Sequence, residues 1–164
     1  MAIHQLGPEW TAERKWKATG RARGRYIGDL EQAIYAKWGE EGLRVIAEVY
    51  RNAAERTFLE GLRSFGIEGD DATAYAKFFV IANSILGYDM ELAEATPKRA
   101  MVRIHTCHLF PKPAEVGGHL CRLANFAFER RAVELLNPKL RVSPGKLQSE
   151  GDPYCEIVVE EVDG

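Results

Sequence analysis

Residues 88–107 read YDMELAEATPKRAMVRIHTC, and within this stretch the spacing of apolar residues becomes that of a β-hairpin. From residue 88 to 93, apolar residues alternate with polar or small ones, as a strand with one solvated face requires. Residues 96–98, Thr-Pro-Lys, are typical of a turn. A second alternating run over residues 99–107 follows, so the stretch predicts two antiparallel strands.

Helical spacing precedes the hairpin. A 3.6-residue apolar period runs through residues 26–38, is interrupted by two glycines, and resumes over residues 43–65. A third helix over residues 72–86 is apolar almost all round, and Asp70 or Asp71 can accept hydrogen bonds from its free amides. The sequence therefore predicts three helices before the sheet, with the third one buried.

The pattern after the hairpin predicts one more helix and two more strands. The helix covers about residues 119–136 and ends before Pro138, and the strands cover about 140–147 and 154–162. A chain of 164 residues has the size of one ordinary domain. We therefore expect a single α+β domain, 1–164, in which N-terminal helices pack on a small antiparallel sheet with an inserted helix, in the order ααα-ββ-α-ββ.

A basic segment precedes the first predicted helix. Residues 12–25 contain six Lys or Arg against one acid, Glu13. Such a segment could grip phosphate or RNA, but its two glycines favour a solvated helix face or a frayed arm. The expected organisation is a basic N-terminal arm or helix (1–25), a helical half (26–87), and a sheet half (88–162) that carries the site.

Composition and charge restrict the class of protein. The chain is 46% hydrophobic and 28% charged, with a formal net charge of −2, which fits a globular protein and gives no general attraction to nucleic acid. No signal pattern and no apolar run of about 20 residues is present, so we expect a cytoplasmic protein without a membrane partner. Three cysteines, an odd and widely spaced set, indicate free thiols in a reducing compartment. Trp10, Trp16 and Trp38 could either cover the core or form the interface of a homodimer.

The segment His105-Thr106-Cys107-His108 is the densest cluster of nucleophilic or metal-binding side chains. Strand alternation puts His105 and Cys107 on one face, and the short link that follows brings back a helix with Cys121 in its first turn. We therefore predict that these three side chains converge at the rim of one buried pocket, with Cys155 of the last strand close by.

These groups have several uses. A thiol beside a histidine, or at a helix start, ionises more readily and becomes a nucleophile. The set Cys107, Cys121, Cys155 and His105 could instead bind zinc or another divalent metal, although the paired C-x-x-C of strong zinc motifs is absent. Free cysteines also often only fill the core, and this explanation is kept open for Cys155 above all. Nucleotide-binding, serine-hydrolase and H-E-x-x-H zinc-protease motifs are absent.

Cys107, Cys121 and the ending Gly-Asp-Pro-Tyr-Cys-Glu-Ile at 151–157 carry a resemblance to a known family. The second half, residues 99–162, resembles the L-2-amino-thiazoline-4-carboxylic acid hydrolase family and, more distantly, the 4-vinyl reductase-like small-molecule-binding domains. In the latter group a metal site uses an acid and two cysteines near the final strand, whereas here Leu147 stands where the penultimate cysteine would fall.

The resemblance implies two functions. The first is a hydrolase of a cyclic or amide-like carbon–nitrogen bond, with Cys121 or Cys107 as nucleophile or metal ligand, His105 as proton carrier and Asn125 as orienting donor. The second is a non-catalytic ligand-binding or sensory domain, in which Arg103 anchors a carboxylate, unless it is an ordinary surface arginine. Phe128 and Glu129, on the helical stripe of Cys121 and Asn125, are the further candidate ligand-binding residues.

Overall fold

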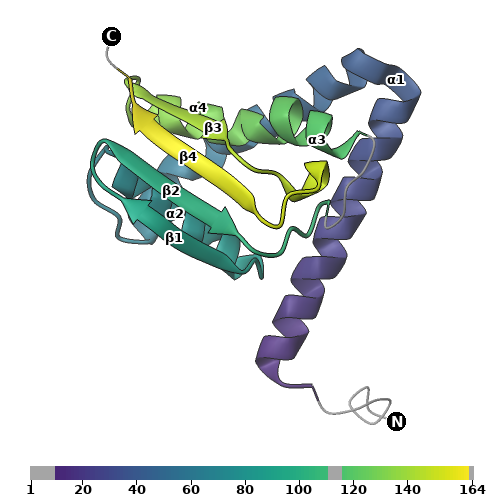
Figure 1. Cartoon of the computed structure of the whole chain (residues 1–164), viewed down its shortest axis with the longest axis horizontal. Helices are drawn as coiled ribbons and strands as arrows, with labels where there is room; N and C mark the ends of the chain where they lie inside the picture. The colour runs from purple at the N-terminus through teal and green to yellow at the C-terminus, as the bar shows by residue number, and fades with distance from the viewer. Residues whose placement is uncertain (1–9, 111–115, 163–164) are drawn as a thin grey trace.

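The computed structural model describes residues 10–110 and 116–162 and shows an α+β fold (Figure 1), which confirms the predicted class. The helical elements are α1 (Ala12–Ser64), α2 (Ala72–Ile85), α3 (Gly117–Leu120), the π-helix η2 (Cys121–Asn125), α4 (Phe126–Leu136) and the short 3₁₀-helix η3 (Gln148–Glu150). The strands are β1 (Met90–Ala95), β2 (Arg99–Ile104), β3 (Leu140–Pro144) and β4 (Cys155–Glu161). None of the described helices is long and apolar enough to cross a bilayer.

Helix α1 is 53 residues long and bends at Gly39. Gly39 has φ 56° and ψ −132°, a conformation open to glycine and strained for other residues, so the predicted interruption of the helix lies where the sequence placed it. The side chain of Thr11 accepts a hydrogen bond from the amide of Arg14 and so caps the first turn. Residues 12–25, for which an arm and a helix were both open, are helical and continuous with the rest of α1.

Glycines in the N-terminal half of α1 allow another segment to approach its backbone. Gly20, Gly24 and Gly28 are buried and recur every four residues, which puts them on one face of the helix. A Cβ atom on Gly28 would lie 2.5 Å from the carbonyl oxygen of Leu109, and Cβ atoms on Gly20 and Gly24 would clash with the backbone of Leu86 and with His108. The interpretation of these glycines as helix breakers is therefore wrong, because they are the contact surface.

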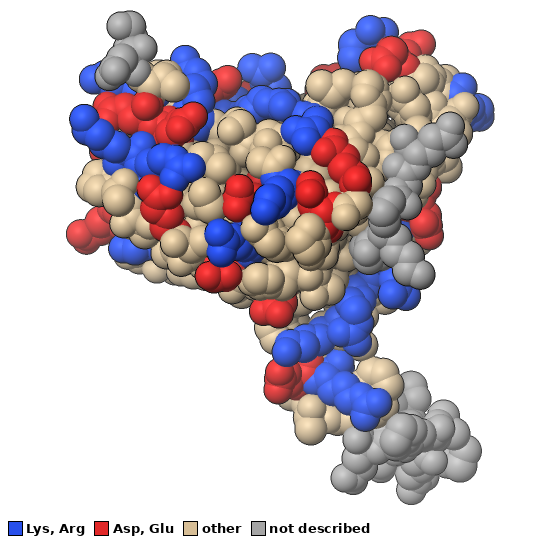
Figure 2. All heavy atoms as spheres, in the orientation of Figure 1, with Lys and Arg blue, Asp and Glu red and all other residues tan. Residues whose placement is uncertain are grey.

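The basic residues of this half are solvated. All six Lys and Arg of residues 12–25 are exposed, and they follow the part of α1 that extends beyond the sheet (Figure 2). Lys17 pairs with Glu13 one turn away, at 2.8 Å. Trp16 donates a hydrogen bond of 2.6 Å from its indole nitrogen to the carbonyl of Ile85, so this ring joins α1 to the end of α2.

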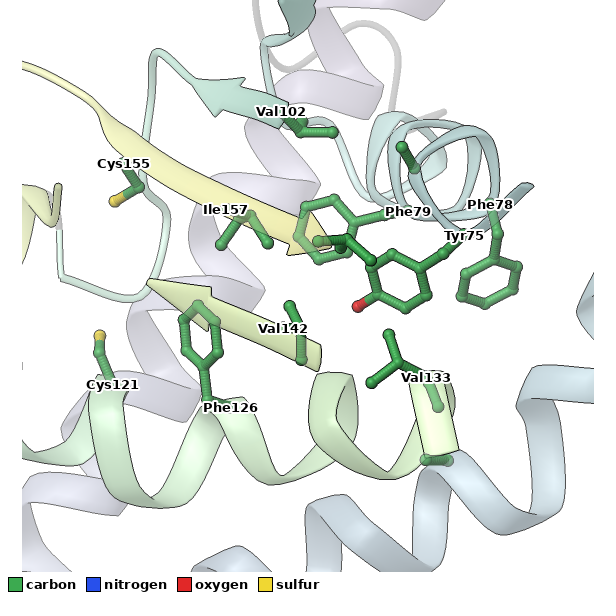
Figure 3. Close-up of a cluster of buried hydrophobic side chains, with 14 of the residues drawn as sticks. Tyr75, Phe78, Phe79, Val102, Cys121, Phe126, Val133, Val142, Cys155 and Ile157 are labelled. Carbon is green, nitrogen blue, oxygen red and sulfur yellow. The ribbon is translucent and has the colours of Figure 1, made fainter. Parts of the chain in front are cut away.

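The sheet is antiparallel throughout, in the order β1-β2-β4-β3. The last strand therefore inserts between β2 and β3, with Val102 opposite Ile157 and Val142 opposite Val159. These inward residues face α2 and α4, and Figure 3 shows the core between sheet and helices filled by aromatic and branched side chains. Residues of one face alternate with exposed neighbours along β3 and β4, as predicted for strands with one wet face.

Two strands end earlier than the sequence predicts. β2 stops at Ile104 instead of residue 107, because the side chain of Gln148 takes over the hydrogen bonds of the backbone at His105 and Cys107. β3 stops at Pro144 instead of residue 147, where the amide of Leu147 turns to the carboxylate of Asp152 at 2.8 Å. The predicted helix 119–136 is present but contains the π-helical turn η2.

Candidate functional site

A cavity of about 380 Å³ lies between the N-terminal half of α1, the end of α2 and the segment η2–α4. The backbone at Gly20 and Gly24 forms part of the α1 wall of this cavity. At these two glycines α1 packs closely against Leu86 and His108. Its volume is within the range of about 300–1,000 Å³ that is usual for small-molecule sites. Elements far apart in the sequence therefore enclose a space of the right size for a small ligand.

Most of the cavity lining is apolar. Five rings from four segments contribute to it: Tyr50, Phe78, Phe79, Tyr88 and Phe128. Phe78 and Phe79 belong to the buried face of α2, the helix that the sequence predicted to be central. Such a wall binds a hydrophobic body and leaves orientation to a few polar groups.

Two of those polar groups come from one helical stripe and form no regular hydrogen bond. The side-chain oxygen and nitrogen of Asn125 are both buried and form no hydrogen bond of normal length and angle in the described part of the chain, although this side chain lies close enough to Glu31 to lower the pKa of that carboxyl. Oε2 of Glu129 likewise has no hydrogen-bond partner there, and both residues line the cavity. Burial raises the pKa of Glu129 from 4.5 to about 7, so its carboxyl is close to half protonated at neutral pH.

A second carboxyl, Glu31 of α1, lies behind this wall. It is 4% exposed, and the hydroxyl of Tyr50 donates a hydrogen bond of 2.5 Å to its Oε1. Burial raises its pKa, and the hydrogen bond from Tyr50 offsets part of that rise. Its other oxygen, Oε2, has no partner among the described residues. Two buried acids thus lie beside an apolar cavity.

The three cysteines gather near the cavity but outside its lining. All three are buried free thiols. The thiols of Cys107 and Cys155 lie close enough to shift each other's pKa, and the hydroxyl of Ser149 donates to Sγ of Cys121 at 3.5 Å. Cys121 and Cys155 lie at the same end of the core in Figure 3. The structure therefore brings the three thiols to one region of the core.

The thiols differ in acidity. The neighbouring thiol of Cys155, with hydrogen bonds from the amides of Phe110 and Leu109, lowers the pKa of Cys107, although burial opposes this. The same pairing with Cys107 and burial raise the pKa of Cys155. Burial raises the pKa of Cys121 to about 12. Cys107 is the thiol of the three that ionises first.

His105 does not join the thiols, which corrects the predicted convergence. Its ring lies on the solvated face of the sheet, where Nε2 is 3.1 Å from Oε2 of Glu91. The expectation assumed that strand alternation continued to Cys107, but β2 ends at Ile104, so the two side chains diverge. His108 takes the inward position instead: it is 3% exposed and stacks on Tyr88 with ring centroids 4.4 Å apart.

Arg103 also lies on the solvated face of the sheet. Its guanidinium is 3.5 Å from Oε2 of Glu156 and stacks over the ring of Tyr154, 5.3 Å from the centroid. It is absent from the lining of the cavity, so the structure favours the ordinary surface arginine over the anchor for a carboxylate ligand.

Within residues 10–110 and 116–162, no three His, Cys, Asp or Glu side chains form a group that could hold a metal ion. The set predicted for zinc fails because His105 faces Glu91 across the solvated side of the sheet. Leu147, which stands where a cysteine would fall in the 4-vinyl reductase-like pattern, is 2% exposed and packs in the core.

The structure places Asn125, Phe128 and Glu129, the stripe beyond Cys121, at the cavity. The sequence analysis missed the other walls, namely α1 with Gly20, Gly24 and Tyr50. The four-residue spacing of the glycines was the signal that could have identified them, because glycines at i and i+4 mark a helix face that accepts close contact.

No protein-family model matches the chain, and no curated protein sequence matches it. Among solved structures, it is similar to the phenol-responsive sensory domain of the transcription activator PoxR with phenol, at 11% identity, with a TM-score of 0.63 and coverage of 84% of this chain and 74% of that one. It is also similar to a trafficking protein particle complex subunit 3 from Naegleria fowleri covalently bound to palmitic acid, at 17% identity, with a TM-score of 0.56 and coverage of 90% and 97%.

At these identities the likeness shows a shared fold. The match to a sensory domain agrees with the distant resemblance to small-molecule-binding domains of the 4-vinyl reductase-like type. It gives no support to membership of the thiazoline hydrolase family. The chain thus shares its fold with a phenol-responsive sensory domain and with a trafficking subunit, and it has a cavity of its own.

Proposed function

We propose that this chain is a small-molecule-binding domain of the sensory type and that its ligand occupies the cavity between α1, α2 and η2–α4. The observation that carries the proposal is that two oxygens in the lining of a mostly apolar cavity, Oδ1 of Asn125 and Oε2 of Glu129, form no regular hydrogen bond. A buried polar group without a partner costs about 1–3 kcal/mol. A ligand that pairs with these atoms offsets that cost, which favours binding.

The comparisons support an apolar ligand. The PoxR domain of similar fold is described with phenol, and the Naegleria fowleri subunit with palmitic acid, which are both molecules with a hydrophobic body and one polar end. The cavity described here has the same division, with rings on its walls and polar atoms at Asn125 and Glu129. A compact molecule with one polar group fits that division.

Calorimetry and thermal unfolding with a panel of ligands test the proposal. The panel contains phenols, aryl alcohols, aryl amines and medium-chain carboxylic acids. At least one class should bind and raise the melting temperature, with a shift that grows with the logarithm of ligand concentration once this exceeds Kd. Ala82→Trp, which puts a large side chain into the lining, should abolish that shift, whereas Ala36→Trp on an exposed position of α1 should retain it. The proposal fails if no ligand of the panel binds. It also fails if the ligands bind to Ala82→Trp as tightly as to the parent protein.

A hydrolase is the second candidate, and the lowered pKa of Cys107 is the observation that favours it. Against it, none of the described residues that line the cavity is a cysteine or a histidine. Turnover separates the two functions. If thiazolines, lactams or amides are consumed, and Cys107→Ser or Cys121→Ser stops their consumption, the domain is an enzyme; ligands that bind unchanged leave the sensory function in place.

A further inference from the structure

Of the three polar atoms in the cavity lining that form no regular hydrogen bond, two are acceptors and one, Nδ2 of Asn125, is a donor. The acceptors are Oδ1 of Asn125 and Oε2 of Glu129, and Oε2 of Glu31 lies one step behind, beside Tyr50. Asn125 and Glu129 are four residues apart, on adjacent turns where α4 begins. A ligand that satisfies these atoms must donate several hydrogen bonds from one place.

Neither acid forms a direct ion pair among the described residues, although the charge of Arg130 acts on Glu129 from a distance and offsets a small part of the rise in pKa that burial causes. None of the ion pairs in the described ranges includes Glu31 or Glu129. Arg130, next to Glu129, donates from its guanidinium to the carbonyl of Arg122 at 2.6 Å, and Arg23 is an exposed residue of the cavity lining. A buried carboxylate without a cation is strongly disfavoured, so a positive ligand would stabilise its ionised form.

The aromatic lining suits the same ligand. Tyr50, Tyr88 and Phe128 surround the polar stripe together with the two phenylalanines of α2. An ammonium group is attracted to the faces of such rings, and more strongly where water is excluded. Rings and carboxylates together are therefore a better match for a cation with a hydrophobic body than for a neutral alcohol, which donates one hydrogen bond.

We propose that the ligand of this cavity is a primary amine in its protonated form, with a compact aromatic or aliphatic body, whose ammonium group is held by the carboxylate of Glu129 and the side-chain oxygen of Asn125. The inference rests on the proposed function, since it assigns the chemical class of the ligand of that same cavity. The body packs on the phenylalanines of α2, and the glycine wall of α1 closes over it.

Binding of this kind is linked to a proton. The carboxyl of Glu129 has a pKa of about 7 in the empty cavity, so below pH 7 it must lose its proton as the ammonium enters. Affinity should be constant from about pH 7 to the pKa of the amine near 10, and should fall by about tenfold per unit below pH 7.

Neighbouring groups leave that window clear. Tyr50 of α1, Tyr75 of α2 and Tyr88 have pKa values raised by burial and stay neutral, and His108 behind Tyr88 has a lowered pKa. Arg23 lines the cavity, and Arg130 follows Glu129 on α4. Glu31, behind Tyr50, is the other nearby acid, and burial raises its pKa.

Titration calorimetry with matched ligand pairs tests the inference. Benzylamine, 2-phenylethylamine and hexylamine are each compared with the alcohol of the same body, at pH 8 and pH 6, in buffers of different ionisation enthalpy. At least one amine should bind at pH 8 about tenfold or more tightly than its alcohol. Its binding should release about one proton at pH 6 and close to none at pH 8.

Two isosteric variants localise the effect. Glu129→Gln should lose the preference for the amine and the release of the proton, while the alcohol still binds. Glu134→Gln, a matched change at a half-exposed acid of the same helix that pairs with Arg131, should retain both. Far-ultraviolet circular dichroism and the melting temperature establish that each variant is folded.

The outcomes separate this inference from the proposed function. Equal or tighter binding of the alcohols, or amine binding without proton release, overturns the amine while the binding domain stands. The same holds if phenols bind, in a manner sensitive to Ala82→Trp, and no amine does. If no member of either panel binds, both the inference and the proposed function fail.

Discussion

The backbone amide of Cys107 donates a hydrogen bond of 2.7 Å to Oε1 of Gln148, a residue 41 positions later in the chain. The side-chain nitrogen of Gln148 donates in turn to the carbonyls of His105 and Pro153, each at 3.1 Å. The backbone amide of Gln148 donates to Sγ of Cys155 at 3.3 Å. One glutamine thus joins the exit of β2 to the entry of β4 and holds the two thiols together.

Gln148→Ala should therefore destabilise the domain by about 1–3 kcal/mol, because it leaves the amide of Cys107 and two carbonyls without partners. Chemical denaturation measures the change. Gln32→Ala is the control: its side chain donates within α1 to the carbonyl of Gly28, and its loss should cost less than about 1 kcal/mol. Equal effects of the two substitutions would contradict the role assigned to Gln148.

The buried carboxyl of Glu129 should make stability depend on pH. Its pKa is about 7 in the folded protein and 4.5 in the absence of its folded surroundings. As pH rises, the unfolded chain therefore releases this proton at a lower pH than the folded protein does. The contribution of this group is most favourable below pH 4.5 and is lost progressively up to pH 7, by at most about 3 kcal/mol at 1.36 kcal/mol per unit.

Glu129→Gln, which mimics the protonated acid, should consequently be more stable than the parent at pH 8 and equal to it at pH 4. Urea unfolding at the two pH values measures the difference. Glu134→Gln should stay within about 0.5 kcal/mol at both. A variant that is less stable than the parent at pH 8 would show that Glu129 has a cationic partner in the folded protein.

Gly24→Ala should destabilise the protein although alanine is the better helix former. The added Cβ would meet the side chain and the backbone of His108, and overpacking of this kind costs about 1–3 kcal/mol, against a gain in helix propensity of about 1 kcal/mol. The variant should also bind ligand more weakly, because Gly24 lines the cavity. Arg25→Ala, on the exposed side of the same turn, should change neither property; unchanged binding by Gly24→Ala would argue against a closed wall at α1.

Cys107 should react with alkylating agents before the other two cysteines. Its pKa is lowered by Cys155 and by two backbone amides, whereas that of Cys121 is raised to about 12. Mass spectrometry after timed treatment with iodoacetamide at pH 8 gives the order. Cys107→Ser should remove the fast reaction and change stability by less than about 2 kcal/mol. Faster labelling of Cys121 would place the ionised thiol elsewhere.

Local patterns predicted most of the fold. The apolar period over residues 43–65 predicted the second half of α1. In the structure, Gly66 follows the end of this helix in the left-handed conformation, at φ 64°. Asp71 caps α2 through the amide of Ala74, as its position before an apolar run indicates. The central place of β4 was beyond prediction, because pairing between distant strands leaves no trace in the spacing of either one.

In the candidate site, too, local patterns predicted some residues, and contacts between distant segments determine the others. Asn125, Phe128 and Glu129 were within reach because one helical stripe contains them all. His105 was misplaced because a side chain from a distant loop, Gln148, ends the strand before it, and no local pattern reports such a contact. The packing of α1 against residues 86 and 108–109 is likewise a contact between distant segments, although its glycines are visible in the sequence.

A cavity wall made of peptide groups has a consequence for how the specificity of this domain can change. Gly20 and Gly24 offer no side chain to enlarge or reshape, and any larger residue there meets backbone. Variation in ligand preference must therefore come from the other lining positions, such as Ile27 and Tyr50 of α1, Ala82 of α2, and Asn125 and Phe128 of the η2–α4 stripe. The two glycines are the fixed part of the lining, and mutational libraries that spare them should recover new ligands without loss of the fold.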